Sequence, residues 1–110
     1  MPYYMTRFRY APEQFRALVD KPQDRAAEVR KAIEGFGGKL HQFFFAFGEW
    51  DGVLIVEFDS AEKGTAFLMT VASSGAVAAL ETTVLITPEA ARRSMEMAGE
   101  MRSAYRPPSG

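Results

Sequence analysis

The chain has 110 residues, 47% of them hydrophobic and 25% charged, which is the composition of one folded domain rather than of a disordered segment. Its formal net charge of -1 offers no positive field to a nucleic acid or an anionic membrane, and no stretch approaches the ~20 apolar residues of a membrane-spanning helix. The absence of cysteine excludes disulfides and thiolate chemistry, and one histidine is too few for a zinc site. We therefore expect a cytoplasmic domain with no metal, no cofactor, no nucleic-acid partner and no membrane association.

The first part of the chain predicts a strand followed by helical segments. Residues 3–10 are aromatic and favour a strand, which Pro12 ends because proline cannot donate a ladder hydrogen bond. Residues 12–19 fit a short helical turn. Apolar residues at helical spacing then predict a helix over about 23–36. Gly37-Gly38 ends this helix, since glycine accepts the left-handed conformation that closes a helix.

Two apolar runs separated by a short turn predict a β-hairpin in the middle of the chain. The second strand is expected over 39–47 and the third over 51–58, with Gly48 in the turn between them. Such short separations join antiparallel neighbours, so these two strands should pair directly.

A capped helix and a fourth strand follow the hairpin. Asp59 or Ser60 is expected to cap a helix that runs to about Ala72, and residues 76–86 predict the fourth strand. A last helix is expected over about 88–105, because a hydroxyl cap at Thr87 precedes a proline at the first helical position. Residues 107–110 are expected to form a disordered tail.

The order strand, helix, strand, strand, helix, strand predicts an α+β, ferredoxin-like βαββαβ domain over residues 1–106. This plan has a four-stranded antiparallel sheet with both main helices on one face. The C-terminal helix is an addition to it.

The two hairpin strands are apolar on both faces, whereas the helices cover only one. Burying a large apolar side chain contributes roughly 1.5–3 kcal/mol, so an uncovered face favours association. Two explanations are open: the C-terminal helix folds over the face, or a second subunit covers it. We favour a homodimer through the open sheet face.

Simple alternation assigns the side chains of the hairpin to two faces. In the second strand it places Leu40, Phe44 and Ala46 on one face and Phe43, Phe45 and Phe47 on the other. In the third strand it places Val53 and Ile55 on one face and Leu54, Val56 and Phe58 on the other.

The hairpin turn also carries a more specific pattern. The run Gly48-Glu49-Trp50-Asp51, entering an apolar strand, resembles the GYD-domain family, whose signature pairs a glycine, an aromatic residue and an aspartate at this turn. The resemblance covers roughly residues 3–88, with Trp50 in place of the usual tyrosine and an apparent extension after Thr87. It implies a dimeric α/β barrel, in which two ferredoxin-like subunits pack sheet against sheet. It implies no general biochemical function.

Five residues are weak candidates for ligand binding: Arg7, His41, Trp50, Asp51 and Glu57. His41 is a general base or a haem ligand in one interpretation, and a half-exposed strand residue without a role in the other. Trp50 and Asp51 either form an aromatic lid with a carboxylate at a pocket mouth, or Asp51 binds turn amides and Trp50 packs on the neighbouring subunit. Arg7 and Glu57 are charges within apolar strands, where a mutual ion pair or a ligand pocket would explain them. No catalytic residue is assigned.

The aromatic residues Tyr3, Tyr4 and Tyr10, with the phenylalanines, either line an apolar pocket between sheet and helices or pack the core. The function we expect is a homodimeric binding or interaction module for a small apolar or aromatic molecule. The alternative is a cofactor-independent enzyme of the barrel group, of oxygenase or isomerase type, with haem handling as a weaker third hypothesis. The sequence does not decide whether the protein is an enzyme.

Overall fold

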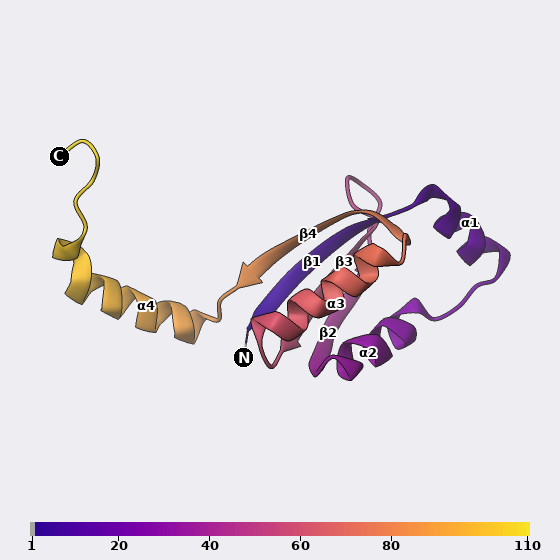
Figure 1. Cartoon of the computed structure of the whole chain (residues 1–110), viewed down its shortest axis with the longest axis horizontal. Helices are drawn as coiled ribbons and strands as arrows, with labels where there is room; N and C mark the ends of the chain where they lie inside the picture. Colours follow the sequence, from indigo (N-terminus) through magenta and orange to yellow (C-terminus); the bar gives the residue numbers. More distant parts are fainter. Residues whose placement is uncertain (1) are drawn as a thin grey trace.

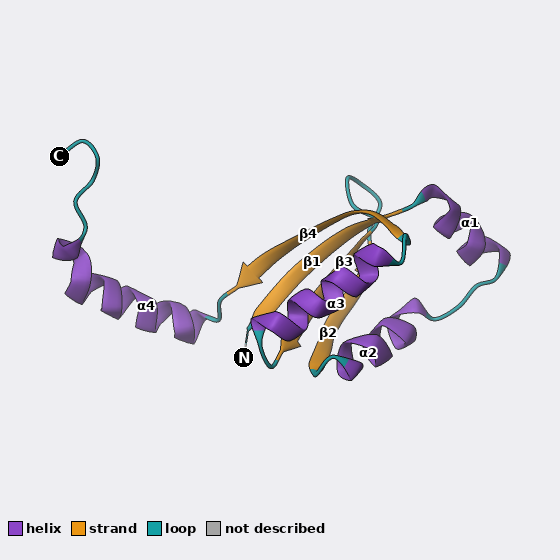
Figure 2. Cartoon of the chain, in the orientation of Figure 1, coloured by secondary structure: helices purple, strands orange, loops and turns teal. Residues whose placement is uncertain are grey.

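A computed structural model describes residues 2–110 and contains one four-stranded antiparallel sheet in the order β2-β3-β1-β4 (Figure 1). Helices α2 and α3 lie across one face of this sheet, as Figure 2 shows. The predicted α+β, ferredoxin-like fold is confirmed. The elements are β1 Tyr3–Tyr10, α1 Pro12–Asp20, α2 Arg25–Gly35, β2 Gly38–Phe45, β3 Gly52–Phe58, α3 Ala61–Ser73, β4 Val77–Leu85 and α4 Pro88–Met101, followed by a short 3₁₀ turn, Arg102–Ala104.

The local signals in the sequence set most element boundaries. The strands and the first three helices lie within two residues of their expected bounds. Ser60 caps α3 by accepting a hydrogen bond from the Lys63 amide, and Thr87 caps α4 in the same way through the Ala90 amide. Gly37 follows α2 with a φ of 79°, the left-handed conformation expected there. The last helix is shorter than expected, because its final residues tighten into the 3₁₀ turn.

The hydrophobic core lies between the sheet and α2 and α3. The side chains of Ile33 from α2 and Phe67 from α3 pack against the central strands β1 and β3. Aromatic rings connect the layers, with Phe67 5.8 Å from Phe58 and 6.0 Å from Phe36 between ring centroids. The buried core residues are Phe8, Ile33, Leu40, Leu54, Val56, Phe58 and Phe67.

The face assignment expected for β2 is wrong, because a β-bulge interrupts its pairing with β3 at His41. Leu40 lies opposite Val56, but the next aligned pair is Gln42 with Ile55. The extra residue reverses the alternation beyond it, since each residue of a strand points to the opposite side from its neighbour. Leu40 therefore shares the helix-covered face with Phe43 and Phe45, and Phe44 lies on the open face.

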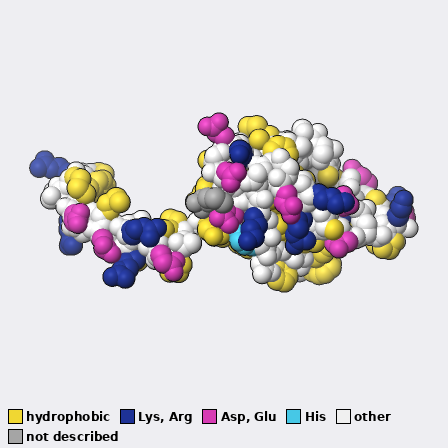
Figure 3. Space-filling view, turned by 90° about the horizontal axis from the view of Figure 1, so that it is seen from below, with side chains coloured by type: hydrophobic (Ala, Val, Ile, Leu, Met, Phe, Trp, Pro, Cys, Tyr) yellow, Lys and Arg dark blue, Asp and Glu magenta, His cyan; other side chains and the backbone are white. Residues whose placement is uncertain are grey.

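Helix α4 does not cover the open face of the sheet. It continues away from the end of β4 and stands apart from the rest of the molecule (Figure 1). Figure 3 shows both charged and hydrophobic side chains on its surface. Met95 and Met97 are 70% and 64% exposed. The hypothesis that this helix folds over its own sheet is therefore wrong. None of the helices in residues 2–110 is long and apolar enough to cross a membrane.

The packing of Phe8 over Gly52 gives a test of the sheet. The two residues are cross-strand partners of β1 and β3, and a Cβ at position 52 would overlap the Phe8 ring. We expect Gly52→Ala to lower the free energy of unfolding by about 1–3 kcal/mol, because a close-packed core accommodates added volume poorly. Gly48→Ala is the matched control, since a Cβ there meets no atom within 4 Å. Urea denaturation compares the two, and equal stabilities would contradict this account.

Candidate functional site

An apolar cavity of about 250 Å³ lies between the sheet and the two covering helices. Phe8 and Tyr10 from β1 and Phe43 from β2 contribute the aromatic part of its wall. Val29 from α2 and Val71 from α3 contribute aliphatic side chains from the opposite side. All the layers of the domain therefore meet at this cavity, which is where ligand sites of such folds are usually formed.

The cavity exists because the wall contributed by α2 is made of small or loosely packed side chains. Only Ile33, in the second half of α2, is fully buried. Ala32 lines the cavity from α2, where it is also exposed to solvent, and Ala76 lines it from the loop just before β4; their methyl groups leave volume that larger side chains would fill.

The aromatic wall is ordered by contacts between its own rings. The centroid of the Phe8 ring lies 4.9 Å from that of Tyr10, in an edge-to-face arrangement, and 6.1 Å from that of Phe43. Tyr10 in turn meets Phe15 of α1 edge-to-face at 5.2 Å. Such contacts hold the rings in place beyond what burial alone provides. The wall thus presents a preformed apolar surface.

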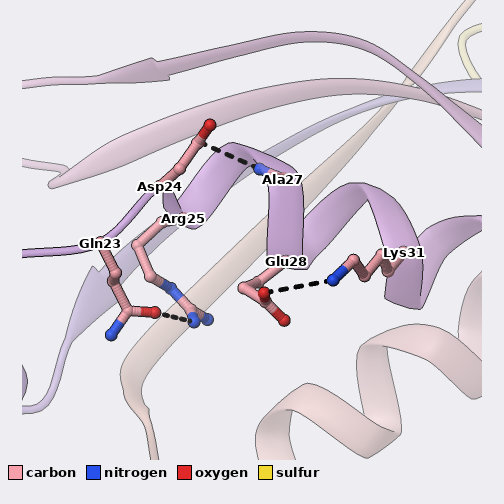
Figure 4. Close-up of polar contacts among 6 residues, drawn as sticks. All are labelled: Gln23, Asp24, Arg25, Ala27, Glu28 and Lys31. Atoms are coloured by element: carbon pink, nitrogen blue, oxygen red, sulfur yellow. Dashed lines mark hydrogen bonds and ion pairs between the residues drawn. The ribbon is translucent and has the colours of Figure 1, made fainter.

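The charged residues of the cavity wall come from the first turn of α2. Asp24 caps this helix by accepting a hydrogen bond from the Ala27 amide at 3.1 Å. Arg25 and Glu28 both line the cavity and project from the same side of α2 (Figure 4). Glu28 forms an ion pair of 3.5 Å with Lys31, and Arg25 Nη1 donates a hydrogen bond to Gln23 Oε1 at 2.9 Å.

A smaller pocket of about 100 Å³ lies beside the main cavity under α3. It shares Thr6 with the main cavity and is also lined by Tyr4 and Thr82. The hydroxyls of Thr6 and Thr82 are 3.0 Å apart and satisfy each other by a hydrogen bond. The buried Thr6 therefore brings no unpaired polar group to the cavity.

None of the five candidate residues lines the main cavity. Arg7 and Glu57 lie on the other side of β1 and β3, and the ion pair expected between them is wrong. The register places Arg7 opposite Glu81 of β4, with which it forms an ion pair. Glu57 instead meets His41, whose Nε2 lies 2.9 Å from its Oε1. The open face therefore carries an ion pair between Arg7 and Glu81 and, separately, a hydrogen bond between His41 and Glu57.

Trp50 and Asp51 hold the hairpin turn against β1. Asp51 Oδ2 accepts a hydrogen bond from the Tyr10 amide at 2.9 Å, so the expected bonds to turn amides are replaced by one to the end of β1. The guanidinium carbons of Arg7 and Arg9 lie 5.2 and 5.3 Å from the centroid of the Trp50 ring, a cation–π arrangement. Both residues therefore stabilise the position of the turn relative to β1.

Sequence reasoning missed the α2 side of the cavity, although a signal was present. Arg25, Val29 and Ala32 recur at a spacing of four and three residues, which places them on one face of a helix. Their side chains are charged, apolar and small in turn, a combination that is unusual for a stripe that only packs a core. Of the tyrosines proposed for a pocket, Tyr10 lines the main cavity, Tyr4 lines the smaller one, and Tyr3 stacks with His41 on the open face at 5.5 Å.

The bond from Asp51 to β1 predicts a clear loss of stability on its removal. Asp51→Ala leaves the half-buried Tyr10 amide without its acceptor, which costs about 1–3 kcal/mol of unfolding free energy. Asp59→Ala is the control, because Asp59 is exposed and forms only a surface ion pair with Lys63, worth about 0–1 kcal/mol. Thermal and urea unfolding measure both variants. If both variants lost the same small amount of unfolding free energy, the hydrogen bond from Asp51 to β1 would not be needed for stability.

Comparison with solved structures supports the fold. The crystal structure of FFRP-DM1 is 16% identical, covers 78% of this chain and 100% of its own, and superimposes with a TM-score of 0.56. The hypothetical protein PHS023 from Pyrococcus horikoshii is also 16% identical, with 79% and 92% coverage and a TM-score of 0.54. Identities this low show similarity of fold alone. A nipsnap family protein of unknown function from Agrobacterium tumefaciens is 15% identical, with 80% and 92% coverage and a TM-score of 0.46.

Comparison with protein families gives the assignment. No curated protein matches the chain. The model of the GYD domain matches residues 4–95, which include the sheet except Tyr3, the turn with Trp50 and Asp51, and the first half of α4. The matched region thus extends beyond the end expected from the sequence at about residue 88. The chain belongs to the GYD-domain family.

Proposed function

We propose that this protein is a homodimeric binding module that holds one small apolar or aromatic molecule in the cavity between the sheet and helices α2 and α3. The cavity itself is the observation that carries the proposal. Its volume of about 250 Å³ lies just below that of pockets for drug-sized ligands, which suits a smaller molecule, and its wall combines apolar side chains with a few polar groups.

The volume suits a ligand with a single ring. An apolar cavity of roughly 150 Å³ is enough to bind benzene, so about 250 Å³ leaves room for a ring and a short substituent. Phe8, Tyr10 and Phe43 offer ring faces and edges to such a molecule. Filling the cavity would restore contacts that its lining lacks when it is empty.

Binding is favoured over catalysis by the distribution of polar groups. A catalytic site needs a base or nucleophile with an orienting partner at the reacting atom. Here Glu28 is the only carboxylate that the described residues bring to the cavity wall, and its ion pair with Lys31 is directed along α2. His41 lies on the opposite side of the sheet, so it is not placed to act as a base or a haem ligand in this cavity.

The homodimer is supported by the open face of the sheet. Met5, Val53 and Ile55 of the two central strands and Phe44 of β2 place apolar side chains there, and α4 leaves them uncovered. Monomeric proteins rarely leave a contiguous patch of this kind in water. A second sheet packed on this face would bury the patch, as in the dimeric barrels that the family resembles.

The charges on this face are compatible with such burial. Arg7 is paired with Glu81 and His41 with Glu57 within one subunit. A charge that enters an interface already paired and hydrogen-bonded avoids most of the cost of an isolated buried charge. Among the described residues, Arg7 Nε stays buried without an acceptor, so the pairing of Arg7 is incomplete.

Filling the cavity tests the binding site. We expect wild-type protein to bind 4-fluorotoluene, with chemical-shift changes and line broadening in ¹⁹F NMR titrations. Ala32→Phe places a ring in the cavity and should abolish this binding, because the ligand and the new side chain need the same space. Ala72→Phe, an exposed position of α3 outside the cavity, should bind as the wild type does. Equal binding by both variants would contradict the proposed site.

Placing a charge on the open face tests the dimer. We expect light scattering after size exclusion to give twice the mass of the chain, and Ile55→Asp to reduce it to that of a monomer, because an unpaired carboxylate would be buried at the interface. Val19→Asp, at an exposed position of α1, should leave the dimer intact. Circular dichroism establishes that both variants are folded. A wild-type monomer at micromolar concentration would refute this part of the proposal.

A further inference from the structure

We infer that the ligand of the cavity is an arylalkyl or aryl carboxylate, held with its ring among Phe8, Tyr10 and Phe43 and its carboxylate on the guanidinium of Arg25. The inference rests on the proposed function, since it requires that the cavity hold a ligand. It adds the chemical class of that ligand and the residue that selects it.

Arg25 is a cation that lines an apolar cavity without a carboxylate partner. In the part of the chain that the structure describes, its guanidinium hydrogen-bonds only to the neutral amide of Gln23, at 2.9 Å (Figure 4). The side chain is half-buried, so solvent screens its charge only in part. A planar guanidinium with free N–H groups is suited to bind a carboxylate through two parallel hydrogen bonds.

The neighbouring charges are already compensated. Glu28 also borders the cavity, but its carboxylate is paired with Lys31 at 3.5 Å. The carboxylate of Asp24 accepts the hydrogen bond that caps α2. The rim therefore has a cation bonded only to a neutral amide, whereas each nearby carboxylate already has a contact within α2. This asymmetry favours an anionic ligand over an amine.

The anion should carry one charge and an attached ring. A phosphate dianion would need several cations or amides, whereas one arginine matches one carboxylate. The apolar wall beyond Arg25 then takes the hydrocarbon part, and the cavity volume limits it to about one ring with a short chain. Arg25 would orient the ligand and the aromatic wall would provide most of the burial.

Three fluorinated probes of matched shape test this assignment by ¹⁹F NMR titration: 4-fluorophenylacetate, 4-fluorotoluene and 4-fluorophenethylamine. We expect the carboxylate to bind about tenfold more tightly than either of the others, a difference of about 1.4 kcal/mol, because a hydrogen bond to a charged group is stronger than one between neutral groups. Arg25→Gln should remove this preference and leave the affinity for 4-fluorotoluene unchanged. Arg30→Gln, an exposed cation of the same helix outside the cavity, should change neither affinity. Arg25→Lys should retain part of the preference, since it keeps the charge without the planar fork.

The outcomes separate this inference from the proposed function. If none of the probes binds wild-type protein, the cavity is not a ligand site and both fail. If 4-fluorotoluene binds as tightly as the carboxylate, or Arg25→Gln leaves the preference intact, the carboxylate assignment is overturned while the binding module stands. Tighter binding of the amine would also overturn the carboxylate assignment, and it would make Glu28 the charged residue that selects the ligand. Loss of binding of all three probes in the Ala32→Phe variant would show that they share the cavity.

Discussion

A single extra residue in β2, at His41, determines on which side of the sheet the hairpin places its side chains. The bulge shifts the alternation of β2 between Leu40 and Gln42, so Phe43 and Phe45 turn toward the helices. Phe43 thereby becomes part of the cavity wall and meets Phe8. The same bulge brings His41 to Glu57 on the open face. Without it, a different set of aromatic side chains would face each side of the sheet.

The sheet therefore separates two kinds of surface. The helix-covered side carries the core, the cavity and Arg25, which hydrogen-bonds to the neutral amide of Gln23. The open side carries apolar side chains, the Arg7–Glu81 ion pair and the hydrogen bond between His41 and Glu57. The proposed ligand site and the proposed subunit interface lie on opposite sides of the sheet, so the two proposals do not compete for residues. Helix α4 belongs to neither surface, because it stands beyond the end of β4 with its methionines exposed.

The residues of the family motif at the hairpin turn stabilise the fold, and none of them lines the cavity. Asp51 fastens the turn to the end of β1, and Trp50 lies against the guanidinium groups of Arg7 and Arg9. These contacts use the aromatic ring and not a phenolic hydroxyl. Replacement of the usual tyrosine by tryptophan therefore keeps the stacking and enlarges the ring that takes part in it. The motif also orders β1, whose Phe8 and Tyr10 line the cavity.

The sequence by itself determined the elements, their order and the family. Strand propensity, helical spacing, hydroxyl caps at Ser60 and Thr87 and the glycine after α2 are local signals, and each acts through the residues that carry it. The ferredoxin-like plan followed from their order. The sequence also shows that Arg25, Val29 and Ala32 share one face of a helix, but it does not show which segment of the chain packs against that face.

Only the tertiary structure decided the register and the partners. The bulge at His41 has no local signature, because it depends on how β2 and β3 align over their length. The pairing of Arg7 with Glu81 rather than Glu57 depends on register, because β3 places Glu57 opposite Tyr3 whereas β4 places Glu81 opposite Arg7. The cavity arises where small side chains from distant segments, Ala32 and Ala76, meet across the layers. These are non-local contacts, and a pattern read along one chain segment contains no information about the segment that packs against it.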